Sequence, residues 1–369
     1  MDPLTHTFTG AALAVAGLRR KTPLATAALI VGANLPDIDG LSYFAGDYRA
    51  LAFRRGVTHG VLALVLLPLL LTAALLLWDR WVRRTRQPNA PPAGAAALLG
   101  VSALAVATHP TLDWLNNYGL RWLMPFDGRW FYGDTLFIVD PWLWLGLGGA
   151  LFLATSHHKA SLVAWGVLWI LMSAVVSLGA PLLPGGAFLG WFAVLALLFV
   201  LRAAAPINAA HSAKLATAAL VLAAAYITTL GIAGRAAHTM AARALAADGL
   251  SVEQVMVAPV PANPFRGQVV AATADAFYTG EFDWLAEPKL RIVVANVPRP
   301  TNDATYRAAA ATPEAQRFLT WSRFPYVEVD STPEGGRVVH FFDARYGGAG
   351  GLIGPTVYLD RHLVPTRVR

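Results

Sequence analysis

The sequence predicts an all-α polytopic membrane domain of about seven or eight helices, with the first two forming a short hairpin, followed by a small β-rich extracytoplasmic domain. Three observations support this fold class. The 369-residue chain is 56% hydrophobic and only 14% charged, whereas soluble domains contain roughly 25% charged residues. Its first two thirds contain apolar runs long enough to cross a bilayer. All six glutamates lie after residue 240, where short alternating segments begin.

Hydropathy defines the expected membrane helices. The longer apolar runs lie at about residues 57–79, 94–112, 141–156, 160–180, 186–202 and 213–234. Two shorter apolar stretches, at about 3–18 and 22–38, are separated by the basic triplet Arg19 to Lys21. This arrangement predicts a tight helical hairpin with its turn in the cytoplasm.

The basic clusters predict how the helices are oriented. Arg19 to Lys21 and Arg80 to Arg86 mark the cytoplasmic side by the positive-inside rule. We therefore attribute the net charge of +7 to basic residues that orient the helices in the membrane. We expect no nucleic-acid partner. The first residues carry an acid in place of a basic leader, so we expect no cleaved signal peptide. The chain contains no cysteine, which excludes disulfides and thiolate ligands.

Five candidate metal ligands are expected on the side opposite those basic clusters. His109 and Asp113 are four residues apart, so they share one face of a helix. The other three candidates lie at the ends of different apolar segments and are His6, Asp37 and His59. Imidazole and carboxylate ligands suit zinc-type metals. We expect one or two divalent ions, with zinc favoured and manganese as the alternative.

Each of these residues also has a local explanation that involves no metal. Asp37 and Asp39 could cap a helix, and His59 could lie among the lipid headgroups. Pro110 disfavours helical geometry at His109, which precedes it. The pair His157 and His158 is interpreted as an interfacial basic marker on the cytoplasmic side. The convergence of three separate motifs on one side of the membrane favours the metal site.

Further polar residues near these ligands are candidates for catalysis and substrate binding. A loop of about 27 residues, 114–140, is rich in aromatics and is expected to cover the site. Arg54 and Arg55 suit a phosphate group or anchor to lipid headgroups. The candidate general bases are Asp39, Asp134 and Asp140.

The composition of the chain changes at about residue 240. Short alternating segments at 290–294, 326–330 and 338–343 predict strands. We therefore predict a helical membrane domain over residues 1–238, which carries the metal site, and a soluble β-rich domain over residues 239–369.

The ordered motifs resemble the bacterial YdjM-like family of inner-membrane, metal-dependent hydrolases over about residues 1–155. The resemblance rests on His6, Asn34 to Asp39, Arg55 to His59, His109 to Asp113, Asn117 to Gly119, Pro125-Phe126 and Asp134 to Pro141. It implies hydrolysis without defining a substrate, and it adds Asn117 to the expected substrate-binding residues.

The ligand order is also similar to that of zinc-dependent phospholipases C and single-strand nucleases. This similarity implies that Asp37, His59, His109 and Asp113 hold one metal, with His6 and a shared Asp113 near a second. The further His, His and Glu ligands of those enzymes have no counterparts after Asp113.

The sequence therefore predicts a metal-dependent hydrolase of the bacterial inner membrane that cleaves a phosphoester in a lipid or lipid-linked substrate. The site and the C-terminal domain are expected on the periplasmic side. Two other classes stay open. One is an ion- or proton-coupled transporter using the same Asp and His residues, and the other is a membrane anchor with a structural metal site.

Overall fold

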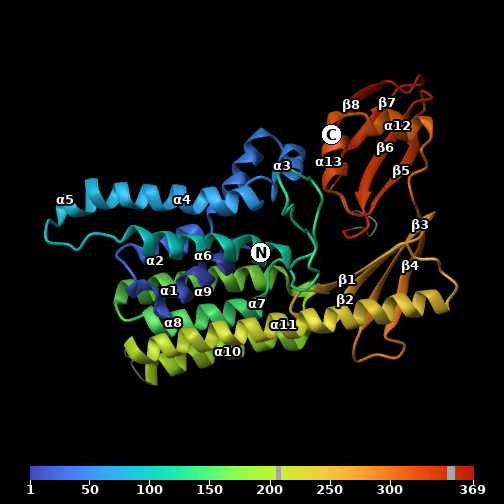
Figure 1. Cartoon of the computed structure of the whole chain (residues 1–369). Coiled ribbons are helices and arrows are strands. Elements are labelled where there is room, and N and C mark those ends of the chain that lie inside the picture. Colours follow the sequence, from blue (N-terminus) through green and yellow to red (C-terminus); the bar gives the residue numbers. More distant parts are fainter. Residues whose placement is uncertain (205–208, 347–353) are drawn as a thin grey trace. The chain divides into compact units, whose positions relative to one another are not determined.

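The computed structural model describes residues 1–204, 209–346 and 354–369 (Figure 1). The chain forms two compact units. The first comprises Met1–Ile38, Arg55–Ile232 and Pro259–Pro264, and the second comprises Asp39–Arg54, Ala233–Ala258 and Phe265–Arg369. Helices build the first unit, and the β-sheets follow in the C-terminal part of the chain. The predicted helical membrane domain followed by a β-rich domain is confirmed. The boundary between residues 238 and 239 and the extracytoplasmic side of the β-rich domain stay predictions.

Five helices among the described residues are long and apolar enough to cross a membrane. They span Val61–Arg86, Ala95–Trp114, Lys159–Leu178, Gly185–Ala204 and His211–Ala247. The first combines α4 (Val61–Trp78), a π-helical turn (Asp79–Arg83) and α5 (Arg84–Arg86). The next three are α6, α9 and α10, and the last lies within α11 (Ala209–Ala247). The shorter apolar stretch Pro141–Thr155 contains α7 (Pro141–Leu143), a π-helical turn (Trp144–Gly148) and α8 (Gly149–Thr155).

The N-terminal hairpin consists of α1 (Pro3–Val15) and α2 (Ala25–Gly32), joined through a 3-10 turn at Leu18–Arg20. Asp2 caps α1, since its carboxylate accepts hydrogen bonds from the amides of Leu4 and Thr5. A Cβ atom at Gly32 would lie 2.8 Å from the Cβ of Ala105 in α6. Only glycine therefore permits this approach between α2 and α6, which brings the end of α2 close to His109.

Aromatic side chains pack the other helices of the first unit together. Phe152 of α8 contacts Trp169 of α9 with ring centroids 6.3 Å apart, and Trp169 contacts Trp191 of α10 at 6.0 Å. All three side chains are buried. Their large apolar surface holds α8, α9 and α10 around α1.

Helix α11 is longer than its apolar run predicts. The sequence places the end of the last span near Arg235, but the helix continues to Ala247. Ala237, Ala241 and Leu245 follow one another at intervals of four residues and pack against strand residues such as Val257 and Val269. This small apolar stripe explains why the helix extends into the second unit.

The second unit contains two four-stranded antiparallel sheets with sequential strand order. The first sheet consists of β1 (Gln254–Val260), β2 (Asn263–Ala272), β3 (Ala276–Asp283) and β4 (Leu290–Pro298). The second consists of β5 (Pro325–Ser331), β6 (Arg337–Asp343), β7 (Thr356–Leu359) and β8 (Pro365–Val368). The three predicted strands correspond to parts of β4, β5 and β6.

Helices accompany these sheets in the second unit. α12 (Ala304–Ala310) and α13 (Pro313–Trp321) lie between β4 and β5 in the sequence. A 3-10 helix, η2 (Leu35–Ala45), leads to α3 (Asp47–Phe53). α3 packs against α13.

Candidate metal centre

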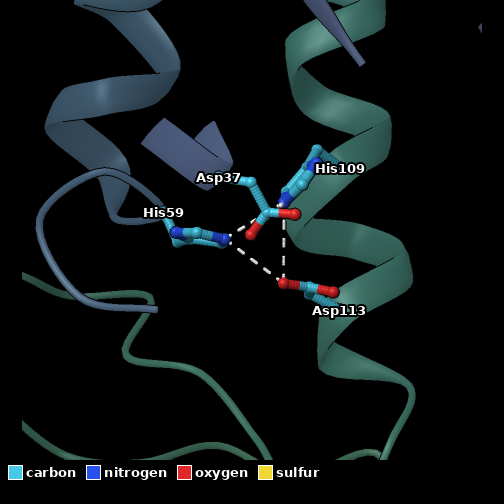
Figure 2. Close-up of side chains that lie close together, drawn as sticks. All are labelled: Asp37, His59, His109 and Asp113. Atoms are coloured by element: carbon cyan, nitrogen blue, oxygen red, sulfur yellow. Dashed lines mark hydrogen bonds and ion pairs between the residues drawn. The ribbon is translucent and has the colours of Figure 1, made fainter. Parts of the chain in front are cut away.

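Four side chains from three separate segments converge in the first unit (Figure 2). Asp37 lies in η2, His59 lies two residues before the start of α4, and His109 and Asp113 lie one turn apart in α6. Each contributes one potential ligand atom, and these four atoms all lie within 4.8 Å of one another. The structure thus brings together residues that are up to 76 positions apart in the chain.

Four of the six distances between these atoms are close to those expected around one ion. His59 Nε2 lies 3.1 Å from His109 Nε2 and 3.2 Å from Asp113 Oδ2. His109 Nε2 lies 3.6 Å from Asp113 Oδ2 and 3.8 Å from Asp37 Oδ1. Ligand atoms in a tetrahedron with zinc bonds of about 2.0–2.1 Å are separated by roughly 3.3 Å. The donor set therefore fits a divalent metal.

Hydrogen bonds on the far side of each ring orient the two imidazoles. His109 Nδ1 donates to the backbone carbonyl of Ala33, 2.7 Å away, because a carbonyl oxygen can only accept. In the neutral ring the lone pair is therefore on Nε2, which faces the cluster. His59 Nδ1 lies 2.9 Å from the hydroxyl of Thr58. Such outer hydrogen bonds are typical of metal-binding histidines.

Helix α6 remains α-helical through the His-Pro step. Pro110 is expected to disfavour helical geometry at His109, yet α6 continues from Ala95 to Trp114. Because the helix persists, the spacing of four residues keeps the side chains of His109 and Asp113 on one face. Contacts of α6 with α2 and α4 compensate for the local preference.

Asp113 is also held by Arg55. The guanidinium places Nε 3.0 Å from Asp113 Oδ2 and a terminal nitrogen 3.1 Å from Oδ1. The same group donates to the side chain of Asn116 at 2.9 Å and to the carbonyl of Gly119 at 3.3 Å. Arg55 is buried and therefore positions Asp113 in this structure. Asn116 was not predicted, although it lies only three residues after Asp113.

His6 lies beside the four-residue cluster. Its ring stacks on His109 with centroids 3.8 Å apart, and its Nε2 lies 3.3 Å from Asp113 Oδ1. The amino group of Met1 forms an ion pair with the same oxygen. Asp113 thus presents Oδ2 to His59 and His109, while Oδ1 faces His6. His6 lies outside the four-residue cluster, and its place near a second ion stays a prediction.

The cluster is accessible at Asp37. The side chain of Asp37 is 20% exposed, whereas His59 and His109 are fully buried and Asp113 is 1% exposed. A molecule reaching the cluster from solvent or from the membrane boundary would therefore meet Asp37 first.

The predicted catalytic residues have different surroundings. Asp39 is buried, and its Oδ1 lies 3.5 Å from Nε of Arg54. Asp134 has a left-handed backbone, with φ of 46°, in the loop after α6. Asp140 caps α7 through the amides of Trp142 and Leu143 and accepts a hydrogen bond from Tyr226 at 3.0 Å.

The predicted substrate-binding residues differ in burial. Arg54 and Asn117 are half-buried, whereas Arg55 is buried. Their roles in binding, and those of the three acids in catalysis, stay predictions.

The comparison with known protein families matches residues 1–182 to the YdjM inner membrane protein family. The YdjM match includes all four residues of the cluster and extends beyond residue 155, where the predicted resemblance ended. No curated protein matches the chain, and no solved structure matches it. The similarity to phospholipases C and nucleases is therefore not confirmed.

Proposed function

We propose that the chain is a membrane-embedded, metal-dependent hydrolase that acts on a phosphoester in a lipid or lipid-linked molecule. The observation that carries this proposal is the cluster of two imidazole nitrogens and two carboxylates with one accessible member, Asp37. Membrane-embedded ionisable residues are costly unless they are paired or coordinated, so their convergence favours a functional site.

Each residue of the cluster has a distinct part in this proposal. Asp37, His59, His109 and Asp113 hold the ion, and Arg55 fixes the orientation of the Asp113 carboxylate. A bound divalent ion such as zinc lowers the pKa of a water ligand toward 7 and polarises a phosphoryl oxygen. The partial exposure of Asp37 leaves one side for substrate. Arg54 is a candidate for a phosphate contact because its charged head is partly exposed.

The position of the cluster supports a lipid substrate. His109 and Asp113 occupy the last two turns of α6, a helix of 20 residues. Such a helix is about 30 Å long, close to the thickness of a bilayer core. The ligands therefore lie near one membrane boundary, where the phosphate groups of lipids are found.

Hydrolysis can be tested with purified full-length protein in lipid nanodiscs. We expect release of product from a phosphodiester or phosphomonoester panel that includes phospholipids, with loss on chelation and recovery with zinc or manganese. His157→Ala is the matched control, since His157 lies outside the cluster and its Nε2 is 2.8 Å from the carbonyl of Ala154. If metal-loaded protein leaves the whole panel intact, the hydrolase proposal fails. Metal- or proton-coupled flux in sealed vesicles would favour a transporter, and metal-dependent stability alone would favour an anchor.

The general base can be assigned by comparing conservative variants. Asp39→Asn or Asp134→Asn should retain the metal and lose turnover if the altered residue removes a proton from water. Asp140→Asn should reduce stability, since Asp140 caps α7. A variant that keeps its normal metal content and its turnover would show that the altered residue has no part in the mechanism.

We also propose that the cluster and the β-rich domain face the periplasm. The absence of native cysteine allows single cysteines at Glu334 and Gln87 to be labelled without background. A membrane-impermeant thiol reagent applied to cells with a permeabilised outer membrane should modify the first position and spare the second. Labelling of Gln87→Cys alone would reverse the orientation.

A further inference from the structure

The helix that carries Asp37 exposes an apolar stripe. η2 extends over 11 residues, Leu35–Ala45, although 3-10 helices longer than three or four residues are uncommon. In a 3-10 helix, residues three apart lie directly above one another. Ile38, Leu41 and Phe44 have this spacing and are 53%, 62% and 92% exposed. They form a continuous apolar face, which we term the 38-41-44 stripe.

The opposite side of η2 is directed into protein. Asp39 is buried, and the hydroxyl of Ser42, three residues later, donates to the Asp39 carbonyl at 2.5 Å. Arg54 lies beside Asp39 at 3.5 Å. The helix is therefore amphipathic, with its polar contacts satisfied internally and its large apolar side chains directed outward.

The chain on both sides of this segment is attached to the membrane part of the protein. Asp37, which belongs to the metal cluster, precedes Ile38 directly. At the other end, Phe53 is only two residues from Arg55, which binds Asp113 at the end of α6. Each residue extends the chain by at most about 3.6 Å. The Cα atom of Leu41 therefore lies within about 15 Å of that of Asp37.

An exposed basic residue follows the stripe, two positions after the exposed Asp47. Arg49 of α3 is exposed and lines a cavity of about 440 Å³ in the second unit, together with Ser42, Phe53 and Arg317 of α13. An exposed apolar face beside arginine side chains is the composition of helices that lie in the headgroup region of anionic bilayers.

We infer that the 38-41-44 stripe is a lipid-binding surface that inserts into the boundary between headgroups and acyl chains of an anionic bilayer. Leu41 and Phe44 enter the apolar layer, while Arg49 remains at the level of the lipid phosphates. This assignment does not depend on whether the cluster hydrolyses a substrate. It requires only that the segment between Asp37 and Arg55 lies at the membrane surface.

Spin labelling tests the insertion directly, because the chain has no native cysteine. Leu41→Cys and Phe44→Cys are labelled with a nitroxide in full-length protein reconstituted into phosphatidylglycerol vesicles. The control is Leu285→Cys, a leucine of similar exposure, 78%, between β3 and β4. Collisions with oxygen, which partitions into acyl chains, are compared with collisions with a water-soluble nickel chelate.

We expect oxygen to relax the labels at positions 41 and 44 several-fold more effectively than nickel, and nickel to dominate at position 285. Nickel dominance at positions 41 and 44 would overturn the proposal. Low access to both reagents with spin-spin broadening would show that a second copy of the chain covers the stripe, which also contradicts it. Gel filtration establishes that the labelled proteins are folded and monodisperse before either comparison is made.

Discussion

Asp113 in the helical unit and Asp343 in the β-rich unit are both buried carboxylates next to an arginine, yet their surroundings differ in kind. Asp343 accepts hydrogen bonds from Arg345, from the hydroxyl of Ser322 at 2.6 Å and from the amide of Arg323 at 2.8 Å. Every one of these neighbours is a donor. Asp343 therefore has a complete set of protein partners.

Asp113 also pairs with cations, Arg55 and the Met1 amino group, but three imidazoles complete its surroundings. His109 directs Nε2 toward Asp113 Oδ2, and this nitrogen carries a lone pair in the neutral ring because Nδ1 donates to Ala33. Lone pairs that face a carboxylate repel it unless a proton or a metal ion lies between them. The two carboxylates are both buried and both paired with a cation, so what distinguishes Asp113 is an imidazole nitrogen directed at it with its lone pair, as a metal ligand would be.

The largest predicted effect is on zinc affinity, which should fall when Asp113 is replaced but not when Asp343 is replaced. Asp113→Asn removes a ligand charge and should weaken zinc binding by about 1,000-fold or more, since even loss of an outer hydrogen bond costs about 10–100-fold. Asp343→Asn should leave metal affinity unchanged. Competition with a chromophoric chelator measures both variants. Equal zinc affinities in the two variants would show that Asp113 is no more a metal ligand than Asp343.

The stability of the β-rich unit should depend on Asp343 and not on Asp113. Asp343→Asn leaves Arg345 buried beside a neutral side chain, and we expect a loss of about 3 kcal/mol in the unfolding free energy of the β-rich unit. The stacked rings of Trp321 and Tyr346 around Arg345 provide a local fluorescence signal for denaturant unfolding. Wild-type stability in this variant would contradict a structural role for Asp343.

A smaller effect is expected from the hydrogen bond behind His59. Thr58→Ala removes the hydroxyl that lies 2.9 Å from His59 Nδ1, and should reduce metal affinity about 10-fold. Thr58→Ser retains the hydroxyl and provides the matched control. If alanine and serine have the same affinity, the Thr58 contact does not orient the ring.

The smallest effect is the acid response of the β-rich unit. Burial raises the pKa of Asp343, but the charge of Arg345 and the hydrogen bonds to the carboxylate outweigh it and leave the pKa below its ordinary value. A depressed folded-state pKa stabilises the fold fully above the unfolded value of about 4, and this contribution is lost as pH falls through the folded value. Wild type should therefore lose stability below about pH 4 more steeply than Asp343→Asn. Parallel pH profiles by denaturant unfolding would be inconsistent with this assignment.

Much of the membrane domain could be predicted because its signals are local. Apolar length identified the spans, and a spacing of four residues placed His109 and Asp113 on one helical face. The basic clusters Arg19 to Lys21 and Arg80 to Arg86 were sufficient to place the other candidates at the same ends of their segments. The structure brings His59 Nε2 to within 3.2 Å of Asp113 Oδ2.

Tertiary contacts account for the features that the sequence did not predict. Pro110 disfavours a helix at His109, but packing against α2 and α4 keeps α6 intact. The sequence predicts a phosphate contact or a lipid-headgroup anchor for Arg55, because its partners, Asp113 and Asn116, lie about 60 residues further along the chain. Nothing in the local pattern shows that the guanidinium is directed inward.

Metal analysis of purified full-length protein tests the central claim, that Asp37, His59, His109 and Asp113 form a metal centre. The protein is loaded with zinc, separated from free ion and analysed by mass spectrometry beside His109→Ala, Asp113→Asn and His157→Ala. We predict one or two bound ions in wild type and in His157→Ala, and loss of at least one ion in the other two variants. The same zinc content in all four proteins, or none in wild type, would contradict the account.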